Sequence, residues 1–180
     1  GILMALKPTL YKVDLQLVDT DRDIYQNCKF TLTQHPSETE LRMMVRLMVY
    51  ALNYHEDLQF TKGLSSQDEP DLWQISPSME VESWIEVGQA SAERMRKGVS
   101  RSPKVTLYAY GSETPIWWQK AASAFAALPH IQVFKFDHQQ VSQLTAMVER
   151  KMEMTLTISA GELFVNCAGH DVNLTLERLL

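Results

Sequence analysis

The spacing of apolar residues changes from one period to another along the chain, and this constrains the fold more than any other feature. From Tyr11 to Val18 ("YKVDLQLV") apolar and polar residues alternate, which is typical of a half-buried strand. A second alternating run, Cys28 to Gln34 ("CKFTLTQ"), follows the polar residues 19–23. We therefore expect the two runs to pair as an antiparallel hairpin near the N-terminus.

A helical period comes next. Ser37 and Glu40 have the spacing of a capping box, in which two side chains satisfy the free N–H groups at the start of a helix. Apolar residues then recur at helical spacing over residues 41–52. This pattern predicts a helix over residues 38–54.

The remainder of the chain alternates predicted strands with predicted helices and ends in a predicted hairpin that turns at Ala160-Gly161. These patterns indicate a mixed α/β (α+β) fold with antiparallel strands at both termini. The predicted strands are residues 58–60, 72–75, 81–87, 105–111, 131–136 and 172–176; the predicted helices are residues 89–98, stopped by Gly98, 114–128, opened by Thr114-Pro115, and 138–150.

The length and composition are those of one globular domain. The 180 residues are 45% apolar and 22% charged, which is ordinary for a soluble protein. We predict a single domain over residues 1–180. No apolar run reaches the roughly 20 residues that span a bilayer, so no membrane partner is expected. The net charge is -5, which gives nucleic-acid binding no support from overall charge.

The N-terminus and the cysteines bear on the setting of the protein. We expect Gly1-Ile2-Leu3 to be an addition and the native chain to start at Met4; no signal-peptide pattern follows. Cys28 and Cys167 stand far apart and form no Cys-x-x-Cys pair, which argues against a disulfide framework or a zinc ribbon. A cytoplasmic location fits this cysteine usage best.

Acidic residues in "DEPDLW" and "VESWIEV" are the main candidates for chemistry. In the strand over residues 81–87, Glu82 and Glu86 share one face. If the strand pairs with the piece that Asp71 begins, Asp71 and Glu86 approach each other, and two close carboxylates favour a divalent cation, most simply Mg²⁺. Such a cation polarises a phosphate and generates a hydroxide. The alternative is that these acids form a solvated face.

Other acids have competing interpretations. Glu40 can complete a metal site from the first helix, or it can serve only as the third residue of the capping box. Asp68 and Glu69 are either loop charges or, if the strand register slips, substitutes for Asp71 in the pocket.

One local basic patch stands out, and it is the candidate contact for a nucleic-acid partner. The alternative is that these charges complement the dipole of a helix C-terminus. The chain contains no Walker motif, Gly-rich dinucleotide loop or Ser/His/Asp order. The patch consists of Arg94, Lys97, Arg101 and Lys104.

Four segments, "YKVDLQLVDTDRDIYQN", "HPSETELRMMVRLMVYAL", "LQFTKGLSSQDEPDLW" and "WIEVGQ", resemble the YaeQ family of bacterial proteins, over nearly the whole chain from Met4 on. That family is similar in fold to the PD-(D/E)XK, or restriction-endonuclease-like, nucleases. The resemblance implies a mixed central sheet flanked by helices and an acidic site of Glu40, Asp71 and Glu86. It also carries a suggested transcription-linked role.

The chain departs from the nuclease pattern at one position. The pattern places a Lys two residues after the strand carboxylate, where it stabilises developing negative charge. Here that residue is Gly88, followed by Gln89, which an ideal strand would point to the opposite face. A bend at the glycine would bring Gln89 into the pocket to orient water or phosphate, and Lys97 or Lys104 would then have to supply the charge.

Two hypotheses therefore follow from the sequence. The first is a nuclease-like protein that holds Mg²⁺ at Asp71 and Glu86 and hydrolyses or binds nucleic acid, with Glu40 and Gln89 assisting. The second is a non-catalytic binding or regulatory protein that keeps the nuclease fold. The clustered carboxylates favour the first, and the missing Lys and the acidic net charge favour the second.

Overall fold

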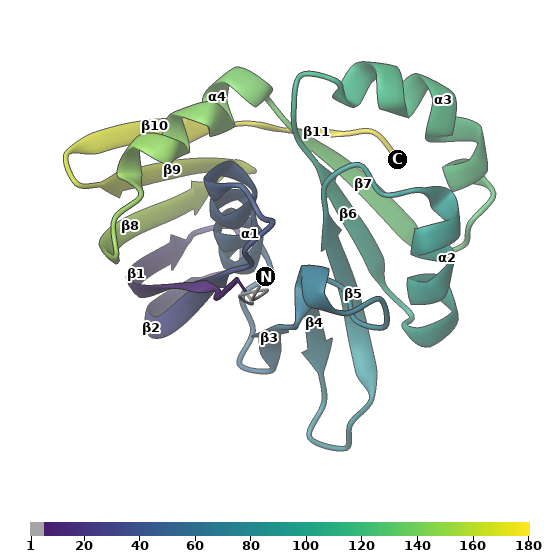
Figure 1. Cartoon of the computed structure of the whole chain (residues 1–180), viewed down its shortest axis with the longest axis horizontal. Coiled ribbons are helices and arrows are strands. Elements are labelled where there is room, and N and C mark those ends of the chain that lie inside the picture. Colours follow the sequence, from purple (N-terminus) through teal and green to yellow (C-terminus); the bar gives the residue numbers. More distant parts are fainter. Residues whose placement is uncertain (1–5) are drawn as a thin grey trace, which may run out of the picture.

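Two β-sheets enclose a central helix in the computed structural model, which describes residues 6–180 (Figure 1). The expectation about Gly1–Leu3 lies outside the described residues. The predicted mixed α/β class is confirmed, but the strands divide between two sheets instead of forming one central sheet. The five-stranded sheet has the order β10-β9-β8-β1-β2, and the six-stranded sheet has the order β11-β7-β6-β5-β4-β3.

The five-stranded sheet combines the N-terminal hairpin with the three strands β8, β9 and β10 of the C-terminal part. Strands β1 and β2 form the predicted antiparallel hairpin, and β8 pairs in parallel with β1. Alternate side chains of β1 are buried, as the sequence pattern predicts. The hairpin of β8 and β9 turns at Ala160 and Gly161, where both residues have positive φ. The strands are β1 (Thr9–Asp19), β2 (Ile24–Gln34), β8 (Lys151–Ser159), β9 (Glu162–Cys167) and β10 (His170–Leu174).

The six-stranded sheet has a parallel centre and antiparallel edges. Strands β5, β6 and β7 are parallel because helices α2 and α3 connect them, whereas β3, β4 and β11 run antiparallel to their neighbours. The predicted pairing of residues 72–75 with 81–87 is therefore confirmed. The strands are β3 (Leu58–Phe60), β4 (Leu72–Ile75), β5 (Val81–Val87), β6 (Val105–Ala109), β7 (Ile131–Phe136) and β11 (Leu176–Arg178).

Three of the predicted helices differ from the structure mainly at their ends, but the helix predicted over residues 138–150 is wrong in length: it is α-helical only over His138–Ser142 and continues as a 3₁₀ turn. The predicted capping box of Ser37 and Glu40 was wrong. Helix α1 begins at Glu40 and its cap is Thr39, whose hydroxyl accepts a hydrogen bond from the Arg42 N–H. The hydroxyl of Ser37 instead pairs with the ring of His35 at 2.7 Å. The helices are α1 (Glu40–Leu52), α2 (Ala92–Arg101), α3 (Thr114–Ala126) and α4 (His138–Ser142), with 3₁₀ turns at Gly63–Ser65 and Gln143–Met147.

Gly98 does not end helix α2, as the sequence suggested, but lies inside it. A Cβ atom at Gly98 would lie 2.5 Å from Cδ1 of Trp84, which is fully buried on β5. The glycine is therefore required by the close approach of helix and sheet, not by a turn.

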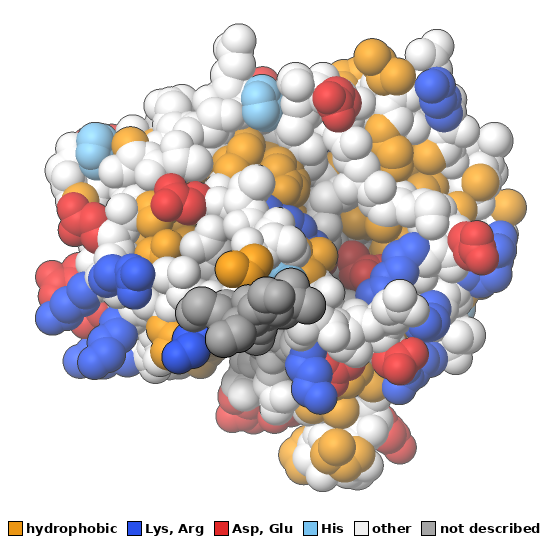
Figure 2. Space-filling view, viewed as in Figure 1, with side chains coloured by type: hydrophobic (Ala, Val, Ile, Leu, Met, Phe, Trp, Pro, Cys, Tyr) orange, Lys and Arg blue, Asp and Glu red, His pale blue; other side chains and the backbone are white. Residues whose placement is uncertain are grey.

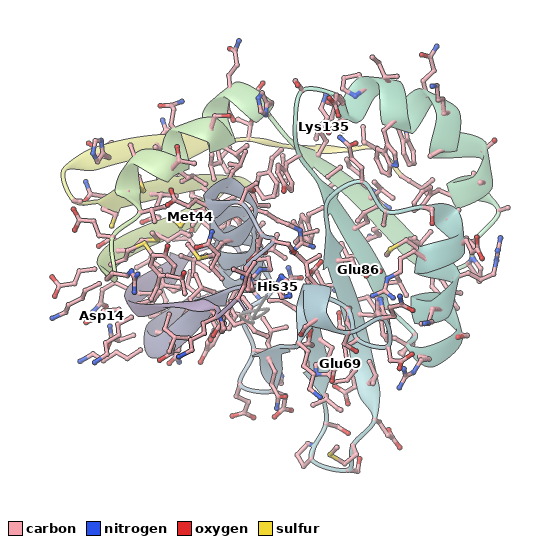
Figure 3. The ribbon with its side chains drawn as sticks, in the orientation of Figure 1. Asp14, His35, Met44, Glu69, Glu86 and Lys135 are labelled. Carbon is pink, nitrogen blue, oxygen red and sulfur yellow. The ribbon has the colours of Figure 1, made fainter. Side chains whose placement is uncertain are left out.

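From Met43 to Val49 helix α1 is buried on all sides because it lies between the two sheets. Figure 3 shows Met44 on the side of α1 that faces the five-stranded sheet. A second, smaller core fills the space between the six-stranded sheet and helices α2 and α3, and Trp84 belongs to it. From Ser83 to Val87 strand β5 is thus covered on both faces, so the alternative of a solvated acidic face is wrong for Glu86 and Asp71, whereas Glu82 is exposed. No helix in the described part of the chain has the length and apolar character needed to cross a bilayer.

The fold predicts a steric cost at the contact between α2 and β5. We expect Gly98→Ala to lower the free energy of unfolding by about 1–3 kcal/mol, because the new methyl group overpacks against Trp84. Urea denaturation measures this loss. Ser100→Ala, at an exposed position of the same helix, serves as the control. A Gly98→Ala protein as stable as the control would contradict the close packing.

Candidate functional site

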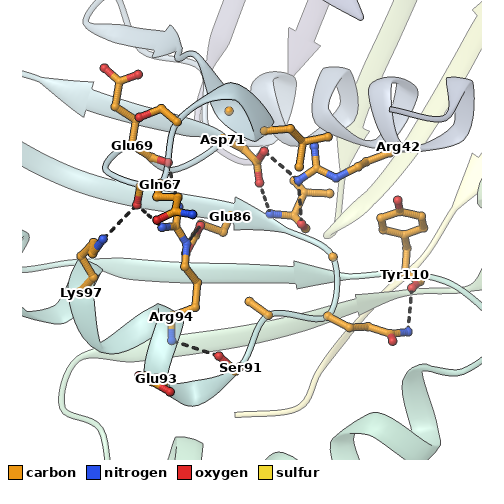
Figure 4. A pocket seen from close by; sticks show the side chains of 17 residues that line it. Arg42, Gln67, Glu69, Asp71, Glu86, Ser91, Glu93, Arg94, Lys97 and Tyr110 are labelled. Atoms are coloured by element: carbon orange, nitrogen blue, oxygen red, sulfur yellow. Dashed lines mark hydrogen bonds and ion pairs between the residues drawn. The ribbon is translucent and has the colours of Figure 1, made fainter. Parts of the chain in front are cut away.

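An open cavity of about 800 Å³ lies at the carboxyl end of β5, between α1, α2 and the loop of residues 61–70 (Figure 4). We call it the acidic pocket because two buried carboxylates, Asp71 and Glu86, line it. Figure 3 shows Glu86 on the six-stranded sheet and Glu69 on the loop that precedes β4. In Figure 2, basic and acidic side chains lie beside one another on this side of the molecule.

Asp71 is fixed by the hairpin of β4 and β5. It precedes β4, whose first residue pairs with Ile85, so Asp71 lies opposite the end of β5. Its Oδ2 accepts a hydrogen bond from the backbone N–H of Val87 at 2.8 Å, and its Oδ1 accepts one from Nη2 of Arg42 at 2.8 Å. Asp71 is only 5% exposed. The sequence prediction that Asp71 and Glu86 reach one pocket therefore agrees with the structure.

Glu86 is equally buried and has two hydrogen-bond donors. Its Oε1 accepts from Nε of Arg94 at 2.8 Å, and its Oε2 accepts from Nε1 of Trp84 at 3.3 Å. Burial raises the pKa of Glu86 above its ordinary value; Arg94 and Trp84 oppose this effect, and the charge of Asp71 adds to it. A buried carboxyl group with a raised pKa in an open cavity is typical of a functional site.

Arg42 connects three parts of the fold at the pocket. Besides Asp71, its Nη2 donates to the carbonyl oxygen of Val87 at 3.2 Å, and its Nη1 donates to Oε2 of Glu38 at 2.8 Å. Burial alone would lower the pKa of Arg42, but the carboxylates of Asp71 and Glu38 outweigh this effect and raise it. The guanidinium is therefore charged and ties α1 to both strands of the hairpin.

Glu38 and Arg46 complete the charge cluster, and the sequence analysis missed both, together with Arg42. Arg46 donates to both carboxylate oxygens of Glu38, at 2.6 and 2.8 Å, and to the carbonyl oxygen of Thr33 at 2.7 Å. Arg42 and Arg46 lie one turn apart on the same face of α1, and Glu38, which precedes the cap Thr39, accepts from both. An arginine inside the apolar run "MMVRLMV" was the available signal, since a buried charge requires a partner.

The structure does not bring Glu40 to the acidic pocket. Glu40 is exposed on the first turn of α1 and does not line the cavity. Within residues 6–180 no group of three His, Cys, Asp or Glu side chains is placed to hold a metal ion. Helix α1 begins two residues later than predicted. The buried acid near its start is therefore Glu38, which precedes the cap Thr39, and not Glu40.

The two neighbouring acids, Asp68 and Glu69, do not take the place of Asp71. Asp68 is exposed and lies 3.5 Å from the ammonium group of Lys97. Glu69 lines the cavity, but its carboxylate accepts a hydrogen bond from the backbone N–H of Lys62 at 3.1 Å. Of Asp68, Glu69 and Asp71, Asp71 is therefore the one that is buried in the pocket.

The predicted basic patch divides into two parts. Arg94, Lys97 and Arg101 lie along one face of α2 and donate to backbone carbonyl oxygens of residues 67–69. They hold the loop over the pocket. Lys104 lies elsewhere, at a separate hollow that Glu82 also lines.

Gly88 and Gln89 take the place of the missing Lys. Gly88 has φ of 112°, which L side chains rarely adopt, and this bend places Gln89 on the wall of the acidic pocket. The Gln89 amide donates to the Thr114 hydroxyl at 3.3 Å and to the Tyr110 carbonyl oxygen at 3.4 Å. Gln89 therefore lines the pocket, but its amide bonds the start of α3.

The pocket has the donor set of a hard divalent cation and also carries its own positive charges. The two carboxylates and the carbonyl oxygen of Val87 are oxygen ligands of the kind that Mg²⁺ takes. The chain itself already balances the charge of the cluster. Its three carboxylates belong to Glu38, Asp71 and Glu86, and its three guanidinium groups to Arg42, Arg46 and Arg94.

These observations define a two-sheet α/β protein whose acidic pocket, at the end of the β4–β5 hairpin, holds buried acids paired with arginines. A family model described as YaeQ protein matches residues 4–176. "Uncharacterized protein YaeQ" of Salmonella typhi is 36% identical over 174 residues, covering 96% of each chain. The relative of the same name from Escherichia coli (strain K12) is 35% identical over 175 residues, covering 96% of this chain and 97% of its own.

Solved structures agree with the sequence relatives. The crystal structure of a YaeQ protein from Xanthomonas axonopodis pv. citri has a TM-score of 0.91 and 37% identity, and covers 96% of this chain and 98% of its own. That of a YaeQ protein from Pseudomonas syringae has a TM-score of 0.91 and 38% identity, and covers 96% of both chains. The chain belongs to the YaeQ family, which confirms the resemblance found in the sequence.

The charge cluster predicts that two nearby glutamates differ greatly in their effect on stability. We expect Glu38→Gln to cost about 3–5 kcal/mol, because it leaves Arg46 buried without a full counter-charge. Glu40→Gln should cost at most about 0.5–1 kcal/mol, since Glu40 is exposed in the first turn. Urea denaturation of both variants measures the difference.

The same comparison has a pH dependence. Burial raises the pKa of Glu38, but the hydrogen bonds and charges of Arg46 and Arg42 outweigh this effect, so the net pKa lies below the ordinary value. Its stabilisation is therefore complete above the ordinary glutamate pKa and is lost as the pH falls through the lowered pKa. Equal losses in the two variants, or a Glu38 contribution that grows towards acid pH, would contradict the role assigned to Glu38.

Proposed function

We propose that this chain is a nuclease-like protein of the restriction-endonuclease-like type, and that its acidic pocket binds a phosphodiester of nucleic acid together with Mg²⁺. The observation that carries the proposal is the meeting of Asp71, Glu86 and the Val87 carbonyl at one end of the β4–β5 hairpin. Two acids buried in an open cavity lose hydration free energy, which a bound cation would restore.

In this proposal Asp71 and Glu86 hold the cation, with the Val87 carbonyl as a third oxygen. The bound cation would polarise a phosphate oxygen and lower the pKa of a water molecule. The hydrogen bond from the Val87 N–H orients Asp71, and the bond from Trp84 orients Glu86, so neither carboxylate needs to rearrange on binding.

The cations on α2 supply the contact with the rest of the nucleic acid. Arg94 and Lys97 line the acidic pocket; Arg94 pairs with Glu86 and Lys97 with Asp68, and the other acceptors that they bind are neutral loop carbonyls. A phosphate oxygen is a stronger acceptor for these groups because it carries a charge. The proposal includes a cytoplasmic setting, in keeping with two buried cysteines that form no disulfide.

A second candidate is a non-catalytic protein that binds nucleic acid and serves in transcription-linked regulation. One observation favours it: no lysine follows the strand carboxylate, and the Gln89 amide bonds Thr114 and the Tyr110 carbonyl. A neutral amide cannot replace a full positive charge in the transition state. The two candidates share the pocket and differ only in hydrolysis.

Calorimetric titration with Mg²⁺ and Mn²⁺ tests the proposal. We expect saturable binding in the millimolar range or tighter, which Glu86→Gln or Asp71→Asn abolishes, because each variant removes a charged ligand. Cleavage assays on single-stranded, duplex and structured DNA and RNA then separate the two candidates. Binding of metal and nucleic acid without cleavage would favour the non-catalytic protein.

The Glu86→Gln variant tests metal binding without loss of structure, because it should remain folded. Since burial raises the pKa of Glu86, folding favours the protonated form, and the stability that this acid contributes is lost as the pH rises through the raised pKa. A neutral amide imitates the protonated acid, so we expect stability at pH 7 to be kept or increased. Unchanged metal uptake in this folded variant would reject the proposed site.

A further inference from the structure

The guanidinium of Arg42 lies where the proposed cation would lie. Its Nη2 is 2.8 Å from Oδ1 of Asp71 and 3.2 Å from the carbonyl oxygen of Val87. These are two of the three oxygens that the proposed function assigns to Mg²⁺. A divalent cation and this nitrogen cannot occupy the same place, and their like charges repel each other.

We propose that Arg42 is a built-in competitor for the divalent cation, which holds Asp71 in the free protein and turns to the phosphodiester when cation and nucleic acid enter together. This inference rests on the proposed function and deepens it. Its consequence is that cation and nucleic acid bind cooperatively. The cation replaces Arg42 at Asp71, and the phosphodiester then gives Arg42 a new acceptor. By linkage, each ligand must raise the affinity of the other by the same factor.

Arg42 has the room and the second anchor that such a movement requires. Arg42 lines the acidic pocket and also a neighbouring cavity of about 410 Å³, which Asp71 and Glu38 line as well. The Nη1 of Arg42 keeps Glu38 at 2.8 Å when Nη2 leaves Asp71. The side chain of Arg42 is 16% exposed, so it already meets solvent at the pocket. The guanidinium can therefore exchange one partner and keep the other.

The other arginines of the cluster are less suited to this role. Arg46 lies deeper and gives all three of its hydrogen bonds to the two carboxylate oxygens of Glu38 and the Thr33 carbonyl. Arg94 bonds Glu86 and two loop carbonyl oxygens, and it contacts neither Asp71 nor the Val87 carbonyl. Among the described residues, Arg42 alone bonds both Asp71 and the Val87 carbonyl.

Titration with Mn²⁺, followed by calorimetry and by the electron paramagnetic resonance signal of free Mn²⁺, tests the inference. We expect Arg42→Gln, without nucleic acid, to bind Mn²⁺ at least ~10-fold tighter than the unchanged protein, equivalent to removing one partly exposed competing ion pair. Arg96→Gln removes the same charge from an exposed position of α2 outside the pocket and should change the affinity less than ~3-fold.

A short single-stranded oligodeoxynucleotide provides the second arm. It should tighten Mn²⁺ binding to the unchanged protein and have a much smaller effect on Arg42→Gln, because that variant has no arginine to exchange. Arg42→Lys keeps the charge but offers one nitrogen in place of three, so it should fall between the two. Circular dichroism and thermal melting check that each variant is folded; if Arg42→Gln is not, Arg42→Lys carries the comparison.

The outcomes separate this inference from the proposed function. Mn²⁺ binding that depends on Glu86 but is equal in the Arg42 and Arg96 variants, or weaker in the Arg42 variants, overturns the competitor role and leaves the proposed function standing. Tight binding without coupling to the oligonucleotide overturns the exchange. No Mn²⁺ binding in any variant overturns both.

Discussion

The bond between Arg42 and Asp71 is the contact on which the arrangement of the pocket depends. It joins the central helix α1 to the hairpin of β4 and β5, and the same guanidinium reaches Glu38 and the carbonyl of Val87. Without it, Asp71 would be a buried charge held by one backbone N–H, because the described residues offer it no second cation. The hydrophobic packing of α1 between two sheets fixes where the arginine stands, and the arginine fixes where the acid stands.

The cluster shows how burial can either stabilise or strain a carboxylate. Glu38 has two arginines and a lowered pKa, so it serves the fold. Glu86 has one arginine and an indole N–H, and its pKa remains raised. The difference lies in the number of full positive charges that contact each acid, since both are almost completely removed from water. An acid that the fold strains in this way is the one that a ligand can relieve, which is why Glu86 belongs to the proposed site and Glu38 to its support.

The sequence predicted much of the architecture and part of the site, for physical reasons that can be named. Periodicity located β1 because its alternate residues are buried, and the strand after Pro70 brought Asp71 to the pocket that Glu86 lines. The acid expected from the first helix, Glu40, came from the family resemblance, and it lies exposed on α1, whereas Thr39 caps the helix and the buried acid is Glu38. The pairs Arg42–Asp71 and Arg94–Glu86 could not be predicted, since only the tertiary fold brings these residues together, whereas the apolar run around Arg46 signalled a buried charge.

A double-mutant cycle on Arg42 and Asp71 tests the central claim most directly. Arg42→Gln, Asp71→Asn and the double variant are compared by urea denaturation, which gives the coupling between the two side chains free of their separate effects. Our account predicts a favourable coupling of about 2–3 kcal/mol, within the range found for residues of one buried charge network. A coupling near zero would mean that the arginine does not hold the acid, and the assignment of Arg42 as the resident cation of the pocket would be wrong.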